Sequence, residues 1–250
     1  MEIRAVSLDL FDTLVDLETG GGAAMQSALR SLHAALAEHL DLDLDAFLGE
    51  LRALERDSRE RVVDQDVEVP TEKRFERLVE HFGLDQPDLP EILTGIHMGV
   101  IRSCVKVPEH HAGVLRALRK RARVGLCSNF THAATVYGIL DEADFRTHLD
   151  AIAISVEVGF RKPRREIFER VLAGLSTQAR HTLHVGDNLR SDVAGAAAFG
   201  MKTAWITRRV EDPEGLLAQH QGPQPDFVVA DLRDLVELVE QAEPGLASPA

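Results

Sequence analysis

Cysteine is scarce in this chain: Cys104 and Cys127 are the two among 250 residues, and their separation fits neither a metal-ligand nor a redox motif. A disulfide scaffold is therefore excluded, and a reducing compartment is expected. No apolar run approaches the roughly 18 residues that a membrane span needs, and the first apolar segment lacks a signal-peptide pattern. We therefore expect a cytoplasmic protein with no membrane partner.

Basic residues are outnumbered, since 28 Lys and Arg against 41 Asp and Glu give a net charge of −13. Nucleic-acid binding needs clustered Lys and Arg, and this sequence has no block of like charge. We therefore expect no nucleic-acid partner, although a local site could attract a small anionic substrate. With 44% hydrophobic residues, a chain of this length can bury a sizeable core without disulfides.

Short apolar runs typical of buried strands recur along the chain, and helical patterns lie between the later runs, from residue 109 onward. Such alternation predicts a parallel sheet covered by helices on both faces. The expected class is α/β with a Rossmann-like parallel core. The predicted strands are Ile3 to Leu10, Val124 to Cys127, Ala151 to Ser155, Thr182 to Val185, Thr203 to Ile206 and Phe227 to Val229.

Residues 16–105 interrupt this alternation, because every apolar repeat there has helical spacing and no strand is apparent. Gly20–Gly22 near one end and Val107-Pro108 beyond the other are typical of loops. We predict an α/β core over 1–15 and 106–242, an inserted all-helical cap over 16–105, and a flexible tail over 243–250. The two junctions would let the cap open and close, and its exposed surface could support a homodimer.

Polar residues stand at the ends of the predicted strands or before a helix. Because ligands bind at the carboxyl edge of a parallel sheet, we expect these side chains to meet there. Each segment alone is weak evidence, since an Asp at a strand end can simply cap a turn. The residues are Asp9, Ser128, Asn129, Lys162, Asp187 and Asp192.

Taken together and in this order, the segments resemble the signature of the haloacid dehalogenase superfamily, and the helical insert is similar to that family's cap. The matching segments are Leu8 to Leu14, Val124 to Asn129, Val158 to Pro163 and His184 to Asp192. The resemblance implies that Asp9 is a nucleophile that forms a covalent aspartyl intermediate. It further implies that Thr13 and Ser128 hold substrate oxygens and that Lys162 compensates negative charge.

The resemblance also implies a Mg²⁺ site. Asp9, the backbone carbonyl of Phe11 and Asp187 would hold the ion, and Asp192 would hold a metal-bound water or orient its neighbours. Oxygen ligands of this kind suit Mg²⁺. The remaining residues predicted to lie beside the substrate are Phe11, Asp12 and Asn129.

One position departs from the family's phosphatases, which usually carry a second Asp two residues after the nucleophile as general acid and base. Phe11 occupies that position here. We do not transfer the role to Asp12, because one step along an extended segment turns the side chain the other way. General acid–base catalysis is typically worth about 10²–10⁴-fold, so we expect alkyl phosphates to react slowly.

Three functions remain open. The first is Mg²⁺-dependent hydrolysis of a small-molecule phosphate ester, which the intact pair Asp187 and Asp192 favours. The second is a 2-haloacid dehalogenase, in which halide leaves without a proton and Phe11 is tolerable. That activity needs a cationic clamp from the cap, where most arginines alternate with acidic residues. The third is a non-catalytic module that binds a phosphate ligand.

Eleven histidines invite a zinc interpretation, above all the adjacent pair His110 and His111. Adjacent residues on a helix point to different faces, and the H-E-x-x-H motif is absent. We therefore interpret these histidines as structural or surface residues.

Overall fold

The centre of the molecule is a six-stranded sheet in the order β5-β4-β1-β6-β7-β8. We describe the chain from a computed structural model over residues 2–18 and 22–242, without the side chains of residues 55 and 57–65. All neighbouring strands of this sheet run parallel, which confirms the predicted α/β class. The strands are β1 (Ala5–Leu8), β4 (Arg123–Ser128), β5 (Ala151–Ile154), β6 (Thr182–Gly186), β7 (Lys202–Ile206) and β8 (Phe227–Val229).

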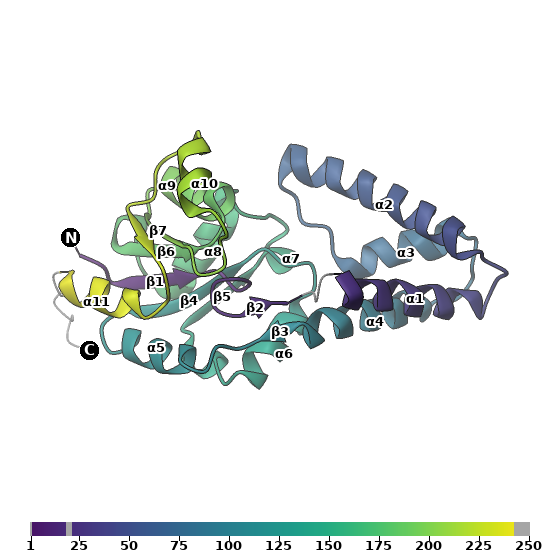
Figure 1. Cartoon of the computed structure of the whole chain (residues 1–250), viewed down its shortest axis with the longest axis horizontal. Helices are drawn as coiled ribbons and strands as arrows, with labels where there is room; N and C mark the ends of the chain where they lie inside the picture. Colours follow the sequence, from purple (N-terminus) through teal and green to yellow (C-terminus); the bar gives the residue numbers. More distant parts are fainter. Residues whose placement is uncertain (1, 19–21, 243–250) are drawn as a thin grey trace.

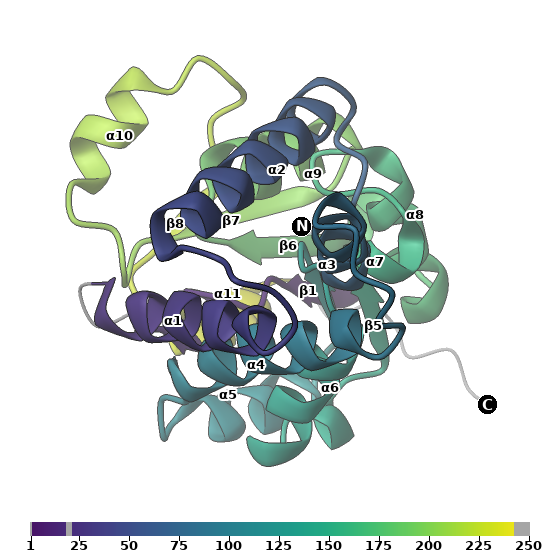
Figure 2. The same ribbon diagram turned by 90° about the vertical axis from the view of Figure 1, so that its right-hand side faces the viewer.

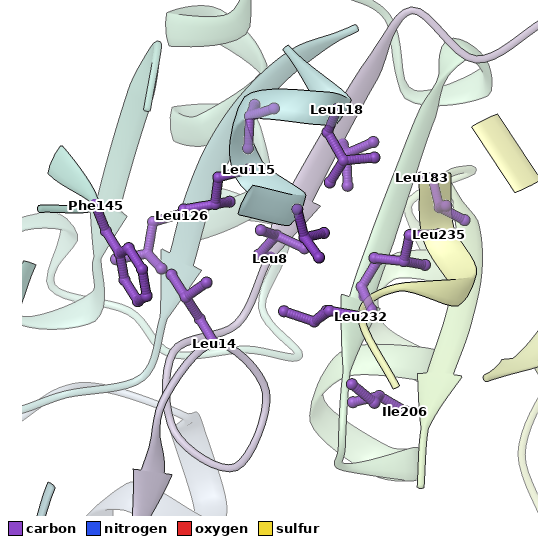
Figure 3. Close-up of a cluster of buried hydrophobic side chains, with 14 of the residues drawn as sticks. Leu8, Leu14, Leu115, Leu118, Leu126, Phe145, Leu183, Ile206, Leu232 and Leu235 are labelled. Carbon is purple, nitrogen blue, oxygen red and sulfur yellow. The ribbon is translucent and has the colours of Figure 1, made fainter. Parts of the chain in front are cut away.

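Helices cover both faces of the sheet (Figure 1). On one face α5 (His111–Leu118), α6 (Ala133–Glu142) and α11 (Asp234–Gln241) pack over β1 and its neighbours. Figure 3 shows part of this core, where leucines of the strands and helices interdigitate. On the other face α8 (Arg165–Leu175) and α9 (Gly195–Ala198) bury Phe168 and Val171. Burying one such side chain is worth about 1.5–3 kcal/mol, so both layers fix the sheet.

The insert forms four helices at one end of the molecule, as Figures 1 and 2 show. They are α1 (Ala23–Ala37), α2 (Leu44–Gln65), α3 (Thr71–His81) and α4 (Leu89–Ser103). Phe47, Phe75, Leu78 and Leu93 build a hydrophobic cluster of their own, separate from the clusters around the sheet. The predicted helical spacing of this segment is confirmed, and its division into a separate domain stays a prediction.

The prediction that residues 16–105 contain no strand was wrong. Strand β2 (Asp16–Leu17) pairs antiparallel with β3 (Val105–Lys106), so that Asp16 faces Lys106 and Leu17 faces Val105. A strand of two residues leaves no alternation to detect, and its partner stands at the opposite end of the insert. The pair closes the base of the insert, where the chain leaves and rejoins the core.

Connecting elements complete the fold: η2 (Arg146–His148), α7 (Ser155–Val158), η3 (Ala179–His181), the π-helical turn η4 (Leu189–Ala194) and α10 (Pro213–Gln219). At the predicted junction, Gly22 precedes α1 with a φ of 93°, a conformation that favours glycine. Gly20, Gly21 and the predicted tail 243–250 lie outside the described residues. Within the described ranges, every helix is too short or too polar to span a bilayer.

Candidate active site

The register of the sheet brings the predicted residues to one edge. Strand β1 lies between β4 and β6, and Leu8 pairs with Leu126 on one side and Val185 on the other. The next residue, Asp9, extends the ladder by donating its backbone N–H to the Val185 carbonyl at 2.9 Å. Ser128 and Asp187 each stand two residues beyond the partners of Leu8. The nucleophile candidate is thus flanked from both neighbouring strands.

Lys162 reaches the same edge and is anchored there by three oxygens. Its Nζ lies 2.6 Å from Oδ1 of Asp9, 2.6 Å from Oδ1 of Asp192 and 2.7 Å from the carbonyl oxygen of Cys127. Its side chain is 1% exposed. An ammonium group has three N–H donors, so all three are used inside the protein. Lys162 therefore acts as a fixed positive charge between two carboxylates.

Asn129 holds the backbone of this lysine. Its Oδ1 accepts the Lys162 N–H at 2.7 Å, and its Nδ2 donates to the Lys162 carbonyl at 3.0 Å. The Asn129 side chain thus holds the Lys162 backbone at the end of β4 through two hydrogen bonds. The predicted contact of Asn129 with substrate stays a prediction, and its geometry gives it a positioning role toward Lys162.

The charges at this edge shift one another's pKa. Burial favours the neutral form of Lys162, but the carboxylates of Asp192 and Asp9 outweigh it and hold the lysine pKa above its ordinary value. Burial would likewise raise the pKa of Asp192, yet Lys162 and His184 hold that pKa below its usual range. Burial raises the pKa of Asp9, and Lys162 opposes part of the rise. Lys162 and Asp192 are therefore a charged pair at neutral pH.

Asp9, Asp187 and Asp192 form a carboxylate cluster in which one oxygen of each lies within 4.8 Å of the others. Burial, and then repulsion from Asp9 and Asp192, raises the pKa of Asp187 to about 7. The backbone of Asp187 is fixed because its carbonyl accepts the Trp205 Nε1–H at 2.7 Å. All three side chains offer oxygen atoms, and the single positive charge of Lys162 does not balance three carboxyl groups. The cluster therefore fits Mg²⁺.

Two hydroxyl groups complete the polar edge. Thr13 is fully buried and Ser128 is 1% exposed. In the described part of the chain, neither Oγ1 of Thr13 nor Oγ of Ser128 has a hydrogen-bond partner. A buried hydroxyl without a partner costs free energy, and an anionic ligand with several acceptor oxygens would relieve that cost. This observation supports the predicted role of both residues.

Phe11 and Asp12 follow the nucleophile candidate in a tight turn. The Phe11 ring packs against Phe130 with 5.0 Å between centroids, which gives this part of the site an apolar wall. Asp12 has a φ of 55°, and its Oδ1 accepts the Leu17 N–H at 3.3 Å and lies 3.4 Å from Nε of Arg209. Asp12 is thus tied to the start of the insert. The predicted contacts of both residues with substrate stay predictions.

A loop of the insert lies against the segment that precedes Lys162. Oε2 of Glu68, in the loop between α2 and α3, accepts the Ser155 hydroxyl at 2.5 Å, and its Oε1 lies 3.1 Å from Nη1 of Arg161. Backbone bonds from Glu68 to Gly159 at 3.0 Å and from Thr71 to Thr131 at 3.1 Å add to this contact. The insert is therefore joined to the core beside the site.

Sequence reasoning missed the supports of these residues. His184 donates from Nε2 to Asp192 Oδ1 at 3.2 Å, and its Nδ1 lies 3.1 Å from the Ser7 hydroxyl oxygen. The sequence does hold a sign of these contacts, because His184 and Ser7 are polar residues inside apolar strand runs. Glu68 and the Cys127 carbonyl left no signal, because their roles depend on contacts between distant segments.

Comparisons with known proteins find hydrolases that are similar to this chain. A family model for haloacid dehalogenase-like hydrolases matches residues 3–200. A pyrimidine 5′-nucleotidase of Escherichia coli is 30% identical over 66% of this chain and 69% of its own length. A glyceraldehyde 3-phosphate phosphatase of Pyrococcus abyssi is 27% identical over 82% and 81%. The crystal structure of a 2-haloacid dehalogenase from Pseudomonas syringae superposes with a TM-score of 0.72 at 20% identity, covering 96% of this chain and 99% of that one.

Proposed function

The chain belongs to the haloacid dehalogenase-like hydrolase family, and from that premise we propose that it hydrolyses phosphate esters of a small anionic molecule with Mg²⁺ as cofactor. One observation carries the proposal. The carboxylate cluster of Asp9, Asp187 and Asp192 lies at the same edge as the unpartnered hydroxyls of Thr13 and Ser128. A cation and an anion with several oxygens together satisfy both sets of groups.

In the proposed reaction, an oxygen of Asp9 attacks phosphorus and the ester oxygen leaves with the bond electrons. A water molecule then hydrolyses the aspartyl phosphate, which releases phosphate and restores Asp9. Lys162 favours the ionised form of the attacking carboxyl and orients it through the 2.6 Å contact. Thr13 and Ser128 would donate to the phosphate oxygens.

Asp9, the carbonyl of Phe11 and Asp187 would hold Mg²⁺, with Asp192 adjoining. The ion supplies positive charge that offsets repulsion between nucleophile and phosphate. Relatives named as a nucleotidase and a phosphatase support the same substrate class for this chain.

The residue at position 11 bears on which leaving groups the protein would accept. At position 11 the side chain is an aromatic ring packed on Phe130, so it has no proton to give. We therefore propose a preference for substrates whose leaving group departs without protonation.

The same observation favours a second candidate, 2-haloacid dehalogenation. There Asp9 would attack carbon, halide would leave with the bond electrons, and an apolar wall at Phe11 and Phe130 is compatible with that step. The retained Asp187 weighs against it, because its charge has no role in a metal-free reaction.

The experiment that separates the candidates compares three substrates with and without Mg²⁺: para-nitrophenyl phosphate, a simple alkyl phosphate and 2-chloropropionate. Mg²⁺-dependent hydrolysis of the aryl ester, with the alkyl ester slow, is the expected result. Chloride release that does not depend on metal would establish the dehalogenase instead.

A further inference from the structure

A second cluster of metal-binding side chains lies away from the carboxylate cluster. His110 stands before α5, His111 is the first residue of that helix, and Asp231 follows β8. One ligand atom of each residue lies within 4.8 Å of the other two. The prediction that the two histidines point to different faces was wrong, because His110 precedes the helix; the two rings lie 4.5 Å apart, edge to face.

His111 is oriented like a metal ligand. It is fully buried, and its Nδ1 lies 2.8 Å from the carbonyl oxygen of Leu14. A carbonyl only accepts, so Nδ1 carries the proton and Nε2 carries the lone pair. Among the described residues, Nε2 has no hydrogen-bond partner. Histidines that bind metals usually donate their other N–H to such an oxygen, which fixes the tautomer.

His110 and Asp231 occupy the solvent side of the cluster. Nε2 of His110 lies 2.8 Å from Oδ1 of Asp231, and their side chains are 27% and 24% exposed. The backbone N–H of Arg233 donates to the same carboxylate oxygen at 3.0 Å, which holds Asp231 in place. His110 and Asp231 are thus partly accessible to solvent, whereas the His111 imidazole is buried.

We propose that His110, His111 and Asp231 bind a transition-metal ion, with Zn²⁺ the leading candidate and water completing its coordination. Two imidazoles and one carboxylate are common Zn²⁺ ligands, whereas Mg²⁺ prefers oxygen. On binding, the proton of His110 moves from Nε2 to Nδ1, and the ion takes the place of the hydrogen bond to Asp231. Because the donor atoms of the two clusters differ, this site would bind Zn²⁺ while the carboxylate cluster would bind Mg²⁺.

The surrounding charges permit a divalent ion. Two cations lie near Asp231. Nε of Arg233 is 3.9 Å from Oδ1 of Asp231, on a side chain that is 67% exposed. Arg208 is the second cation, with Nε 4.0 Å from Oδ2 of Asp231. Its guanidinium makes a two-pronged ion pair with Asp16, with Nη1 to Oδ2 at 2.9 Å. Asp16 thus engages the Arg208 guanidinium, and solvent screens the exposed Arg233, so the Asp231 carboxylate stays available as a ligand.

The proposed role of the ion is structural. Through His111 it is linked to Leu14, which directly follows Thr13, and through Asp231 to the connection between β8 and α11. Occupancy would tie together three segments that are far apart in sequence. A metal ion bound to the folded state alone raises its stability by mass action.

The test uses the full chain, freed of metal with a chelator and then saturated with Mg²⁺ to fill the carboxylate cluster. Zn²⁺ is titrated by calorimetry, and the thermal unfolding midpoint is recorded with and without Zn²⁺. The variants are His110→Ala and Asp231→Asn, which are partly exposed and spare buried His111. The matched control is His81→Ala, since His81 pairs with Glu50 at 3.1 Å in the same kind of contact but without a second histidine.

We expect the wild type and His81→Ala to bind one equivalent of Zn²⁺ and to unfold at a higher temperature with it. Each ligand variant should lose at least about tenfold in affinity, as metal-site substitutions commonly do, and should lose the rise in unfolding temperature. Failure of the wild type to bind, or unchanged binding in both ligand variants, would overturn the proposal. Co²⁺ gives a second readout, because imidazole-bound Co²⁺ absorbs visible light and His110→Ala should weaken that band.

Discussion

Nζ of Lys162 lies 2.6 Å from Oδ1 of Asp9, although 153 positions separate the two residues. The contact is buried, and the ammonium also serves Asp192 and the Cys127 carbonyl. Such a pair is expensive to desolvate and is retained only when its hydrogen bonds are satisfied. Its geometry therefore supports both the fold and the chemistry proposed for Asp9.

Replacing Lys162 tests this dual role. Lys162→Met leaves two buried carboxylates without their cation, so we expect a loss of about 3–5 kcal/mol in the free energy of unfolding. Urea denaturation without metal measures it. Lys202→Met is the matched control, because Lys202 pairs with Asp226 at 2.8 Å while 39% exposed, and exposed pairs contribute little. Similar losses in both variants would show that burial of the Lys162 ion pairs does not increase their contribution to the free energy of unfolding.

Glu68 should stabilise the junction between insert and core. Glu68→Ala leaves the Ser155 hydroxyl and the Arg161 guanidinium without their carboxylate, and we expect a cost of about 1–3 kcal/mol. Denaturant midpoints of the purified variants give the comparison. Glu142→Ala removes an exposed carboxylate paired with Arg102 and should leave the midpoint nearly unchanged. Equal midpoints for the two variants would contradict the assigned role.

Phe11→Asp should restore the missing proton donor. We expect the rate on alkyl phosphates to rise by up to about 10²–10⁴-fold relative to aryl phosphates. The measured quantity is the ratio of kcat/KM for the two substrates. Phe11→Asn is the matched control, since it removes the ring from Phe130 in the same way but has no acid. If both variants change the ratio equally, proton donation does not limit the reaction.

Mg²⁺ binding should depend on pH through Asp187. The pKa of this carboxyl is about 7 in the folded chain, so below that pH a proton must leave before the ion binds. Affinity should therefore fall by up to about tenfold per pH unit below 7 and level off above it. Calorimetric titrations across this range measure the slope. An affinity that stays constant from mildly acidic to mildly alkaline pH would contradict the assignment of Asp187.

The raised pKa of Asp187 should also make the stability of the metal-free protein depend on pH. A folded-state pKa raised above the unfolded value of 3.8 favours the folded state below that value, and this contribution is lost as pH rises toward 7. Asp187→Asn removes the titrating group. Its unfolding free energy should vary less with pH over this window than that of the wild type, which chemical denaturation at several pH values can measure.

Much of the sheet and its carboxyl edge could be predicted from local sequence. Buried parallel strands read as continuous apolar runs, and each predicted run coincides with an observed strand to within two residues. Asp9, Ser128 and Asp187 meet because they stand at the carboxyl ends of strands that are neighbours in the sheet: Ser128 is the last residue of β4, and Asp9 and Asp187 directly follow β1 and β6. Local patterns therefore sufficed wherever strand ends fix the position of a side chain.

Contacts between distant segments could not be predicted. Asn129 clasps the backbone of Lys162 across 33 positions, and Glu68 meets Ser155 across 87. Neither contact leaves a periodic pattern, since each depends on the path of a loop. The approach of His110 and His111 follows from the point at which α5 begins, and helix boundaries are poorly defined by sequence.

The role of Asp9 as nucleophile is tested most directly by the rate of Mg²⁺-dependent para-nitrophenyl phosphate hydrolysis by Asp9→Asn beside the wild type. The amide is close in shape to the carboxylate, and circular dichroism with an unfolding curve can confirm that the variant is folded. We expect Mg²⁺-dependent hydrolysis by the wild type and none by the variant, because an amide cannot serve as the nucleophile. A folded Asp9→Asn variant that hydrolyses the ester at the wild-type rate would contradict this role.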